Sequence, residues 1–283
     1  MVLFKKSADL RNYIDSQYQK TSRVGFVPTM GALHKGHLSL IETSKKDNGL
    51  TICSIFINPT QFNDPKDFEK YPITLEADIY KLEKIGCDLL FLPSVNEIYP
   101  AGKFPAIKYP IGSLETILEG KYRPGHFQGV CMVVHRLLSI VQPNHLYLGR
   151  KDYQQCMVVE RLLNIIGMND QVALTICPTL RQQDGLALSS RNRRLNEKEK
   201  SQAPIIFQML EFIKEHIKDG DLNHLKEKAS KNLEANGFKL DYVEIANAKT
   251  LQPVLEWNGK DQLVALIAAF INDVRLIDNM LLN

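Results

Sequence analysis

Apolar residues in the first two thirds of the chain fall into short continuous runs, and longer stretches with helical spacing separate these runs. Runs of this length that are rich in Val, Ile and Leu are typical of strands buried on both faces. They occupy residues 24–27, 50–57, 89–92, 145–148 and 172–176. Strands that alternate with helices predict an α/β fold, a Rossmann-like parallel sheet with helices on both faces.

Two of the intervening stretches have a clear helical pattern. One helix is predicted after Thr74, a possible N-cap, with one apolar face formed by Leu75, Ile79, Leu82 and Ile85. Residues 130–141 are apolar nearly all round, which indicates a buried helix. Ligands of parallel sheets bind beyond the carboxyl ends of the strands, so we expect the functional residues in the loops that follow the runs.

The pattern changes after Pro178, where a polar loop and a basic segment interrupt the alternation. Asn196 and Glu199 have the spacing of a capping box, which predicts a long helix from about residue 196. A second helix is expected after Asp221, and three short strands are expected at 239–246, 263–270 and 275–278. We therefore predict a Rossmann-like domain over residues 1–178 and a smaller α+β domain over residues 179–283.

Composition narrows the class of protein. A chain of 283 residues can bury a full core, and its formal net charge of +3 is too small to argue for wholesale binding of nucleic acid. The N-terminal residues lack the apolar core of a signal peptide, and no apolar run is long enough to span a membrane. The five scattered cysteines show no metal-ligand spacing and are typical of free thiols in a reducing compartment, so we expect a cytoplasmic protein.

The first candidate segment follows the run at residues 24–27 and contains two histidines, His34 and His37, that flank Gly36. A loop between a strand and a helix can direct backbone N–H groups and the positive end of the helix dipole toward phosphate oxygens. Gly31 and Gly36 would allow close approach of the backbone. The two imidazoles would add donors to the same phosphates. The alternative is that one histidine packs structurally and the other is solvated.

Polar residues also follow the second run. Asn58 and Gln61 offer amide donors and acceptors suited to a small substrate with hydroxyl and carboxylate groups, although an ordinary Asn-Pro turn is the simpler explanation. Farther along, Asp78 could help to hold Mg²⁺ through water, or it could be a solvated acid on an exposed helix face. Tyr71 lies close to it in the sequence.

Three further segments carry charge or hydroxyl groups. Arg123 and His126 lie in a glycine-containing basic loop, where Arg123 could pair with an anionic substrate and His126 is expected to bond the backbone. His135, within the apolar helix, is expected to be a core residue. The run at 145–148 leads into Lys151, which can bring a mobile charge to phosphate oxygens. Around residues 189–191, two serines and an arginine form either a loop that closes over a triphosphate or a flexible basic linker.

Taken together, these segments resemble the pantothenate synthetase family within the His-x-Gly-His nucleotidyltransferases. The resemblance is carried by the strings Pro-Thr-Met-Gly-Ala-Leu-His-Lys-Gly-His (28–37), Asn-Pro-Thr-Gln-Phe (58–62), Arg-Pro-Gly-His-Phe-Gln-Gly (123–129), Gly-Arg-Lys-Asp (149–152) and Gly-Leu-Ala-Leu-Ser-Ser-Arg-Asn (185–192). Residues 275–279 also resemble the C-terminal signature of the family. The chain departs from the family pattern at Ile73, where Arg is usual, and at Gln182 or Gln183, where Glu is more frequent.

The resemblance implies an ATP-dependent ligase that condenses (R)-pantoate with β-alanine through a pantoyl adenylate, with Mg²⁺ accompanying ATP and a homodimeric assembly. It implies catalytic roles for His34, His37 and Lys151. It places pantoate and β-alanine near Gln61, Gln155, Asn58, Tyr71 and Arg123. The implied ATP-binding residues are Pro28, Thr29, Met30, Gly31, Ala32, Leu33, His34, Lys35, Gly36, His37, Gly149, Arg150, Lys151, Asp152, Leu180, Leu188, Ser189, Ser190 and Arg191.

Other functions are compatible with some of these segments. A nucleotidyltransferase that acts on a phosphorylated substrate would share the first and last segments but would need an anion pocket where Asn58 and Gln61 stand. An aminoacyl-tRNA synthetase fragment would need an RNA-binding surface, for which the charge gives no support. A catalytically silent nucleotide-binding module is the third alternative. A turnover assay separates it from the enzymes.

Overall fold

The five apolar runs form neighbouring strands of one parallel sheet in the computed structural model, which describes residues 1–17, 23–100, 107–218 and 220–283. Each observed strand agrees with its predicted run to within two residues at either end. The strands are β2 (Val24–Thr29), β3 (Leu50–Ile55), β4 (Leu89–Phe91), β5 (His145–Gly149) and β6 (Ala173–Cys177).

A sixth strand, β1 (Val2–Phe4), lies at the edge of the sheet and was not predicted. It pairs in parallel with β4, through Val2 opposite Leu89 and Phe4 opposite Phe91. A strand of three residues is too short to show an alternation of its own, so its pairing depends on the neighbouring strand.

The strand order is β1-β4-β3-β2-β5-β6. From β2, the chain adds β3 and then β4 on one side of the sheet. It then crosses back, and β5 pairs with β2 on the other side. The carboxyl ends of β2 and β5 flank the topological switch point, which is where open parallel sheets form a ligand crevice.

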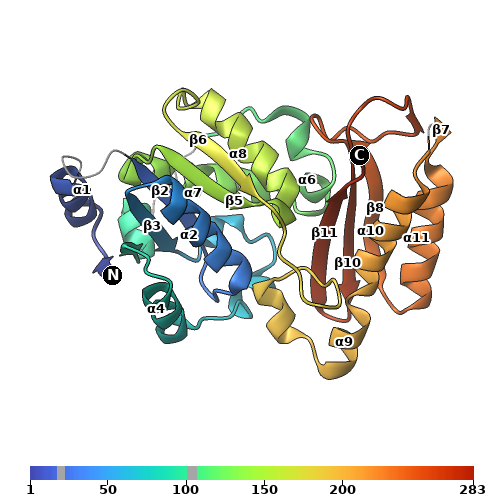
Figure 1. Cartoon of the computed structure of the whole chain (residues 1–283), viewed down its shortest axis with the longest axis horizontal. Helices are drawn as coiled ribbons and strands as arrows, with labels where there is room; N and C mark the ends of the chain where they lie inside the picture. Colours follow the sequence, from blue (N-terminus) through green and yellow to red (C-terminus); the bar gives the residue numbers. More distant parts are fainter. Residues whose placement is uncertain (18–22, 101–106, 219) are drawn as a thin grey trace.

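Helices cover both faces of the sheet (Figure 1). One face is packed by α1 (Ser7–Gln17), α7 (His126–Val141) and α8 (Tyr153–Ile165), which share a single apolar cluster with the strands. The other face is packed by α2 (Lys35–Asp47) and α4 (Leu75–Lys84). The predicted buried helix is α7, which begins four residues earlier than predicted, after Gly125 in the left-handed conformation.

Shorter elements connect these layers. They are α3 (Pro65–Glu69), α5 (Val95–Ile98), α6 (Glu119–Tyr122) and the 3₁₀ turns η1 (Pro59–Gln61), η3 (Gly112–Glu115), η4 (Arg150–Asp152) and η5 (Ser190–Arg194).

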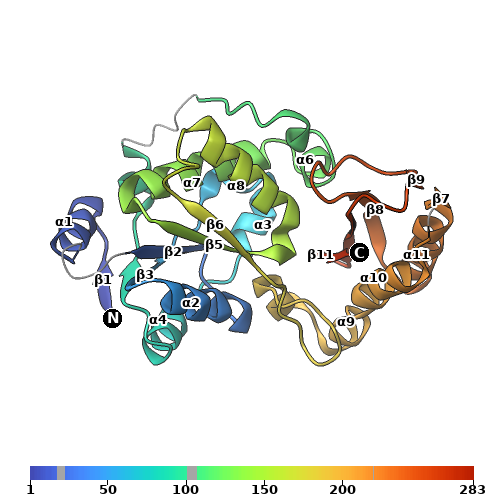
Figure 2. The same ribbon diagram turned by 45° about the horizontal axis from the view of Figure 1, so that its top comes forward.

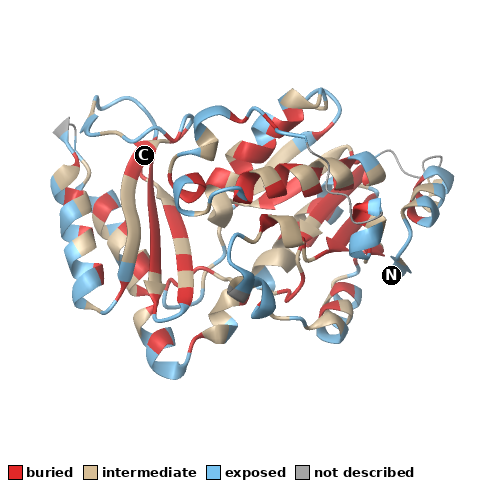
Figure 3. Cartoon of the chain, turned by 180° about the vertical axis from the view of Figure 1, so that it is seen from behind, coloured by how far each residue is buried: buried red, intermediate tan, exposed pale blue. Residues whose placement is uncertain are grey.

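The C-terminal part contains an antiparallel sheet of three strands in the order β11-β10-β8. These are β8 (Lys239–Asn247), β10 (Leu263–Ile271) and β11 (Val274–Leu281), close to the three predicted strands. The central strand β10 is buried along almost its whole length (Figure 3). A two-stranded ribbon of β7 (Gly220–Asp221) and β9 (Glu256–Trp257) lies beside it.

The long helix predicted from residue 196 is in fact two helices. The Asn196–Glu199 capping box is present, but the first helix, α9, covers only Glu197–Gln202. Pro204 then precedes α10 (Ile205–His216), because proline lacks the N–H that a continuous helix needs. The helix expected after Asp221 is α11 (Asn223–Ala235).

Two apolar clusters lie on opposite faces of the antiparallel sheet. The helices α10 and α11 pack on its outer face, where they share a core with β10 and β11 (Figure 2). The inner face packs on the parallel-sheet unit, where Leu118 and Tyr153 meet Val264 and Leu266. The second sheet is therefore held against α6 and α8, next to the switch point.

The described residues include no helix with the length and hydrophobicity needed to cross a membrane. All five cysteines are buried and free, as predicted. Burial raises the pKa of Cys87 and of Cys131 to about 12, so these two thiols stay protonated near neutral pH.

Candidate active site

A cavity of about 230 Å³ lies at the carboxyl ends of β2 and β5, and the inner face of the antiparallel sheet closes one side of it. The structure brings most of the residues singled out in the sequence to this cavity. Those that line it are Pro28, Thr29, Met30, His34, Gly36, His37, Gln61, Tyr71, Arg123, Gly149, Lys151, Asp152, Gln155, Leu180, Leu188, Ser189, Ser190 and Arg191.

The two histidines form a stacked pair at the start of α2, with ring centroids 4.0 Å apart. The backbone N–H of His34 donates to Nδ1 of His37 over 3.4 Å. An Nδ1 that accepts a hydrogen bond carries no proton, so a neutral His37 has its proton on Nε2. This ring therefore presents an N–H donor.

Both imidazoles are held in the neutral form. Burial, together with the neighbouring His37 and Lys151, lowers the pKa of His34 to about 2. Burial also lowers the pKa of His37 to about 4, although Asp152 and Asp78 partly oppose the shift. The pair consequently acts through hydrogen bonds near neutral pH rather than through positive charge.

Gly36 is required by the position of the His34 ring. A Cβ at residue 36 would lie 2.9 Å from Cε1 and Nδ1 of that ring. The close approach at this glycine is thus made by an imidazole of the protein itself, and a methyl group would push His34 out of the stack.

Three consecutive backbone N–H groups of the loop before α2 are already hydrogen-bonded, contrary to our expectation of a phosphate cradle. The N–H of Gly31 donates to the Thr29 hydroxyl over 3.2 Å. Those of Ala32 and Leu33 donate to the Asp78 carboxylate, each over 2.8 Å. The N–H groups of Gly31, Ala32 and Leu33 are therefore satisfied within the protein and are not directed at a phosphate.

Asp78 is neither a solvated acid nor a free metal ligand. Its side chain is 1% exposed, and each oxygen accepts a backbone N–H from the loop. Thr74 donates to both oxygens over 3.2 Å, and Lys81 lies 3.7 Å away. The expectation that this residue holds Mg²⁺ is therefore corrected, because its oxygens are already engaged by the loop.

Lys151 and Asp152 enter the cavity from the turn after β5. The ammonium group of Lys151 lies 3.6 Å from the Asp152 carboxylate. Asn279 of β11 donates through its side-chain amide to the carbonyls of Arg150 and Lys151, over 2.9 and 2.8 Å. Sequence reasoning noted Asn279 only as part of a C-terminal signature. Its role in holding this turn depends on a contact across more than a hundred residues of sequence.

Gln61 lines the cavity, whereas Asn58 lies behind it. The Asn58 amide donates to the Gln61 side chain over 3.2 Å and to the Gly129 carbonyl over 3.1 Å, and its oxygen accepts from Tyr99 over 3.0 Å. Asn58 is 1% exposed. The substrate contact expected for Asn58 is therefore not what its geometry supports, because its hydrogen bonds are used to orient Gln61.

His126 bonds the backbone, as predicted. Its Nδ1 lies 2.7 Å from the Gln61 carbonyl oxygen, and its Nε2 lies 3.1 Å from Nη1 of Arg123. Burial lowers the pKa of His126 to about 3, so the neutral ring donates to Gln61 and accepts from Arg123. His135, in turn, is only partly buried and meets the Tyr109 hydroxyl at 2.9 Å.

Arg123 faces both the cavity and a buried ion-pair network. It lies 3.8 Å from Glu119, which Arg275 of β11 contacts through two bonds of 2.7 and 2.8 Å. Burial acts to raise the pKa of Glu119, but Arg275 outweighs it and lowers that pKa to about 2. The network joins α6 to the antiparallel sheet behind Arg123.

Two adjacent glutamines of α8 both border the cavity but differ in exposure and in their hydrogen bonds. Gln155 lines the cavity, as expected. Gln154 is 2% exposed, accepts from the Glu119 N–H over 2.9 Å and donates to the carbonyls of Leu114 and Ile117. Gln155 is thus available for a ligand, whereas the side chain of Gln154 holds the chain that precedes α6.

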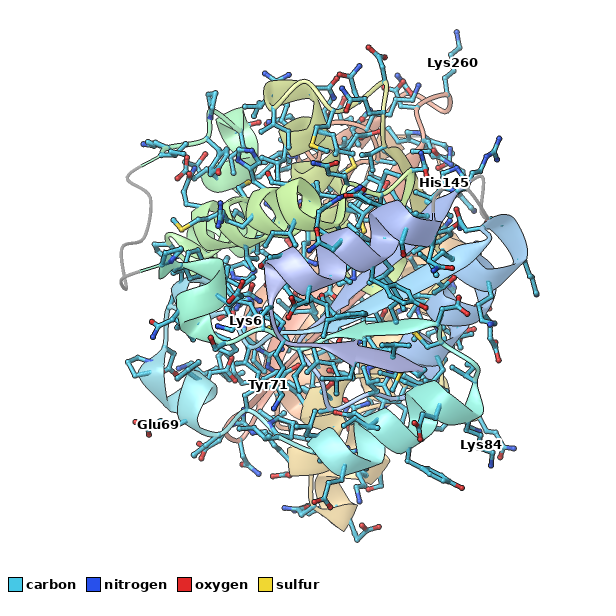
Figure 4. All side chains as sticks on the ribbon, turned by 90° about the vertical axis from the view of Figure 1, so that its left-hand side faces the viewer. Lys6, Glu69, Tyr71, Lys84, His145 and Lys260 are labelled. Carbon is cyan, nitrogen blue, oxygen red and sulfur yellow. The ribbon has the colours of Figure 1, made fainter. Side chains whose placement is uncertain are left out.

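The turn at residues 189–194 is tied to the first loop and to α3. Ser190 donates to the Ala32 carbonyl over 3.1 Å and contacts the Tyr71 hydroxyl. Arg191 and Arg194 share one carboxylate, that of Asp67, at 2.6 and 3.0 Å. Figure 4 shows Tyr71 toward the middle of the molecule, whereas Glu69 and Lys84 extend from its edge.

Some residues of the expected ATP set lie away from the cavity. Ala32 and Leu33 are 0% exposed, and Leu33 belongs to the apolar core beneath the loop. Lys35 is exposed at the start of α2. Leu180 and Leu188 both line the cavity, but the Leu180 carbonyl accepts the Leu188 N–H over 2.9 Å. Any backbone contact with a base at Leu180 would therefore use its N–H rather than its carbonyl.

A second cavity of about 490 Å³ opens beside the first, between α3 and the antiparallel sheet. Arg123, Lys151, Asp152, Ser189 and Arg191 border both cavities. The two spaces are thus continuous parts of one site, with amide and imidazole groups at its inner end and mixed charges at its outer end.

The parallel sheet, its switch-point cavity and the paired imidazoles beside a lysine define a Rossmann-like α/β enzyme with a site suited to a nucleotide. A sequence model of the family described as pantoate-beta-alanine ligase matches residues 2–281. The chain belongs to this family, and it is a ligase that forms a carbon–nitrogen bond between pantoate and β-alanine.

Individual relatives agree along the whole chain. Pantothenate synthetases from Cytophaga hutchinsonii and Leptospira biflexa are 41% and 43% identical, each over 100% of this chain and 99% of the relative. The crystal structure of pantothenate synthetase from Thermus thermophilus superposes with a TM-score of 0.90 at 38% identity, covering 99% of both chains.

A second solved relative is described with ligands. Pantoate-beta-alanine ligase from Francisella tularensis, complexed with beta-gamma ATP and beta-alanine, superposes with a TM-score of 0.83 at 39% identity. The alignment covers 99% of this chain and 97% of the relative.

Proposed function

We propose that the ligation proceeds in two steps through a pantoyl adenylate. A carboxylate is a poor electrophile, so it must be activated before an amine can attack it. In the first step the pantoate carboxylate attacks the α-phosphorus of ATP and pyrophosphate leaves. In the second step the amine of β-alanine attacks the acyl carbon, and AMP leaves to give pantothenate. The observation that carries the proposal is the convergence of His37, Lys151, Gln61 and Gln155 on one cavity.

His34, His37 and Lys151 serve the phosphate side of the first step. The neutral His37 ring offers its Nε2–H to a phosphate oxygen, and Lys151 offers a positive charge to the same group. Donors that are fixed before the reaction can stabilise the charge that develops on these oxygens without reorganising. No protein nucleophile is needed, since the attacking group belongs to pantoate.

The segment with Ser189, Ser190 and Arg191 serves the pyrophosphate end. Ser189 and Arg191 line the same cavity as the histidines, and their hydroxyl and guanidinium groups suit phosphate oxygens. Ser190 acts mainly by joining this segment to Ala32. The adenosine half is expected along Gly149, Leu180 and Leu188.

Gln61, Gln155, Tyr71 and Arg123 serve pantoate and β-alanine. The two glutamines supply amide donors and acceptors for hydroxyl and carboxylate groups. Arg123 faces the shared border of the two cavities, where the carboxylate of β-alanine would find a cation. Asn58 acts through Gln61, which it bonds from behind the cavity, and His126 bonds both Arg123 and the Gln61 carbonyl from the cavity wall.

Mg²⁺ is expected to arrive with ATP and to neutralise phosphate charge. Within the described residues no group of three or more His, Cys, Asp and Glu is arranged to hold a metal. The site fits an ion held mainly by phosphates, because Mg²⁺ in such sites needs only one or two carboxylates. Asp152, which lines the cavity and is 47% exposed, is the carboxylate placed to hold it.

The assembly and surroundings of the enzyme are also part of the proposal. We assign residues 1–178 to a nucleotide- and pantoate-binding domain and residues 179–283 to a smaller domain that carries the phosphate loop. We assign a homodimer in the cytoplasm, in keeping with the buried free thiols. Sedimentation at several protein concentrations tests the dimer. Domain closure on ATP would reduce the radius of gyration in solution scattering.

The decisive experiment is pantoate-dependent exchange of labelled pyrophosphate into ATP without β-alanine. Exchange requires a reversible adenylation of pantoate, so it is expected here. A nucleotidyltransferase with a phosphorylated substrate would exchange with that substrate and not with pantoate. Absence of pantoate-dependent exchange, with ATP binding intact, would reject the two-step route.

A further inference from the structure

Ala32 and Leu33 lie in the loop that leads into the histidine pair. Side chains from outside this loop bond the backbone N–H and carbonyl groups of both residues. The Ala32 N–H and the Leu33 N–H donate to Asp78, each over 2.8 Å. The Ala32 carbonyl accepts from Ser190 over 3.1 Å, and the Leu33 carbonyl accepts from Lys81 over 2.7 Å. No polar atom of this dipeptide backbone is left for a ligand.

The backbone conformation explains why the loop needs such support. Gly31 and Ala32 both have positive φ, at 82° and 49°. The left-handed conformation is unfavourable for alanine, so it persists where the surroundings impose it. Asp78 and Lys81 lie three residues apart on α4, and this spacing puts both on the face that meets the loop. Asp78 accepts from the two N–H groups, and Lys81 donates to the Leu33 carbonyl.

The hydrogen bonds that hold Ala32 and Leu33 also affect the orientation of the two histidines. Leu33 precedes His34, whose N–H donates to Nδ1 of His37 and so fixes the proton of that ring on Nε2. A shift of the Leu33 peptide would move this N–H, and the orientation of both rings would change with it.

We propose that Asp78 and Lys81 are positioning residues for adenylation, which hold the loop so that the His37 Nε2–H meets the phosphate. Neither touches the ligand cavity, and neither takes part in the attack of β-alanine on the adenylate. The inference rests on the two-step route proposed above. It predicts that loss of either residue slows the first step and spares the second.

The experiment measures the two steps separately in Asp78→Asn and Lys81→Met. Pantoate-dependent pyrophosphate exchange reports adenylation, and a single turnover of supplied pantoyl adenylate with β-alanine reports the second step. Asn keeps one acceptor but turns an NH₂ group toward a backbone N–H, which breaks one of the two bonds. Misplacement of a catalytic group by about 1 Å can reduce a rate by roughly 10²-fold, so we expect at least a tenfold loss of exchange.

Matched controls come from the exposed face of the same helix. Glu76→Gln and Lys84→Met make the same charge changes at exposed positions and are expected to leave both steps unchanged. Lys81→Arg keeps a donor for the Leu33 carbonyl and is expected to recover much of the exchange lost in Lys81→Met. If Asp78→Asn fails to fold, the two Lys81 variants decide the matter.

The possible outcomes are distinct. Selective loss of exchange in the Asp78 or Lys81 variant supports the inference. Exchange within about twofold of the wild type, or equal loss of both steps, overturns it, since a merely less folded enzyme loses both in proportion. Absence of exchange in the wild type instead rejects the two-step route itself.

Discussion

Two aspartates hold two neighbouring segments of the active site, and they do so in different ways. Asp78 is 1% exposed and accepts two backbone N–H groups of the loop before the histidines. Asp67 is 24% exposed and binds two guanidinium groups of the turn at residues 190–194, those of Arg191 and Arg194. The first aspartate holds backbone in place, whereas the second holds two arginine side chains.

The difference matters when a polyphosphate arrives. A buried carboxylate bound to backbone amides has no better partner within reach, so the histidine side stays fixed. Arginines paired with a partly exposed carboxylate can exchange it for phosphate oxygens at little cost. One side of the site is therefore preorganised, and the other can adapt to the ligand.

The strongest test of the fixed side removes its donors. His37→Ala and Lys151→Ala are each expected to reduce adenylation on the order of 10²–10³-fold, the usual effect of losing one preorganised donor. Pyrophosphate exchange measures this loss, and circular dichroism checks the fold.

His216→Ala is the matched control, because His216 lies exposed on α10 and its ring bonds the Phe212 carbonyl of its own helix. Near-normal exchange in His37→Ala or Lys151→Ala would remove that residue from the mechanism.

The fold could be predicted largely from hydrophobic pattern. Five strands of the parallel sheet and three of the antiparallel sheet match the predicted runs. The signal is clearest for strands buried on both faces, such as β3 and β10, because they leave a continuous apolar run. The misses were β1, which has three residues and depends on β4, and the break between α9 and α10. Pro204 was present as a signal for that break.

The site was less predictable in its details. The pattern placed His34, His37, Asn58, Gln61 and Lys151 at the carboxyl edge of the sheet, since each follows a predicted strand. It could not tell which polar groups face a ligand and which satisfy the backbone. Asn58 was expected at the substrate, and Asp78 was expected at Mg²⁺ or in solvent, but they bond Gln61 and the loop. Asn279 was not expected to hold the Lys151 turn. Such contacts join residues far apart in sequence.

Acid should destabilise the fixed side through its buried imidazoles. The pKa values of His34, His37 and His126 are lowered to about 2, 4 and 3 in the folded protein, below the value of about 6.5 for an unfolded chain. As the pH falls through 6.5, these histidines bind protons in the unfolded state but stay neutral in the folded state. Each histidine therefore reduces the free energy of unfolding by up to about 1.4 kcal/mol per pH unit, down to its folded pKa.

Urea unfolding between about pH 7 and about pH 5 measures this dependence. His126→Gln keeps a donor and an acceptor but cannot titrate, so its loss of stability across this range should be smaller than that of the wild type, by up to about 1.4 kcal/mol per pH unit. His216→Gln, at an exposed position, should behave as the wild type. Equal pH dependence in wild type and His126→Gln would show that His126 is not held neutral.

The smallest effect is expected on the adaptable side. If Asp67 competes with phosphate for Arg191 and Arg194, then Asp67→Asn should lower the KM for ATP by a few fold at low salt, since a partly exposed ion pair is worth about 0–1 kcal/mol. The gain should shrink as ionic strength rises. Asp273→Asn is the control, because Asp273 borders the same cavity but its carboxylate pairs with Lys70 instead. A raised KM for ATP in Asp67→Asn would mean that the carboxylate orients the arginines for phosphate, and both sides of the site would then be preorganised.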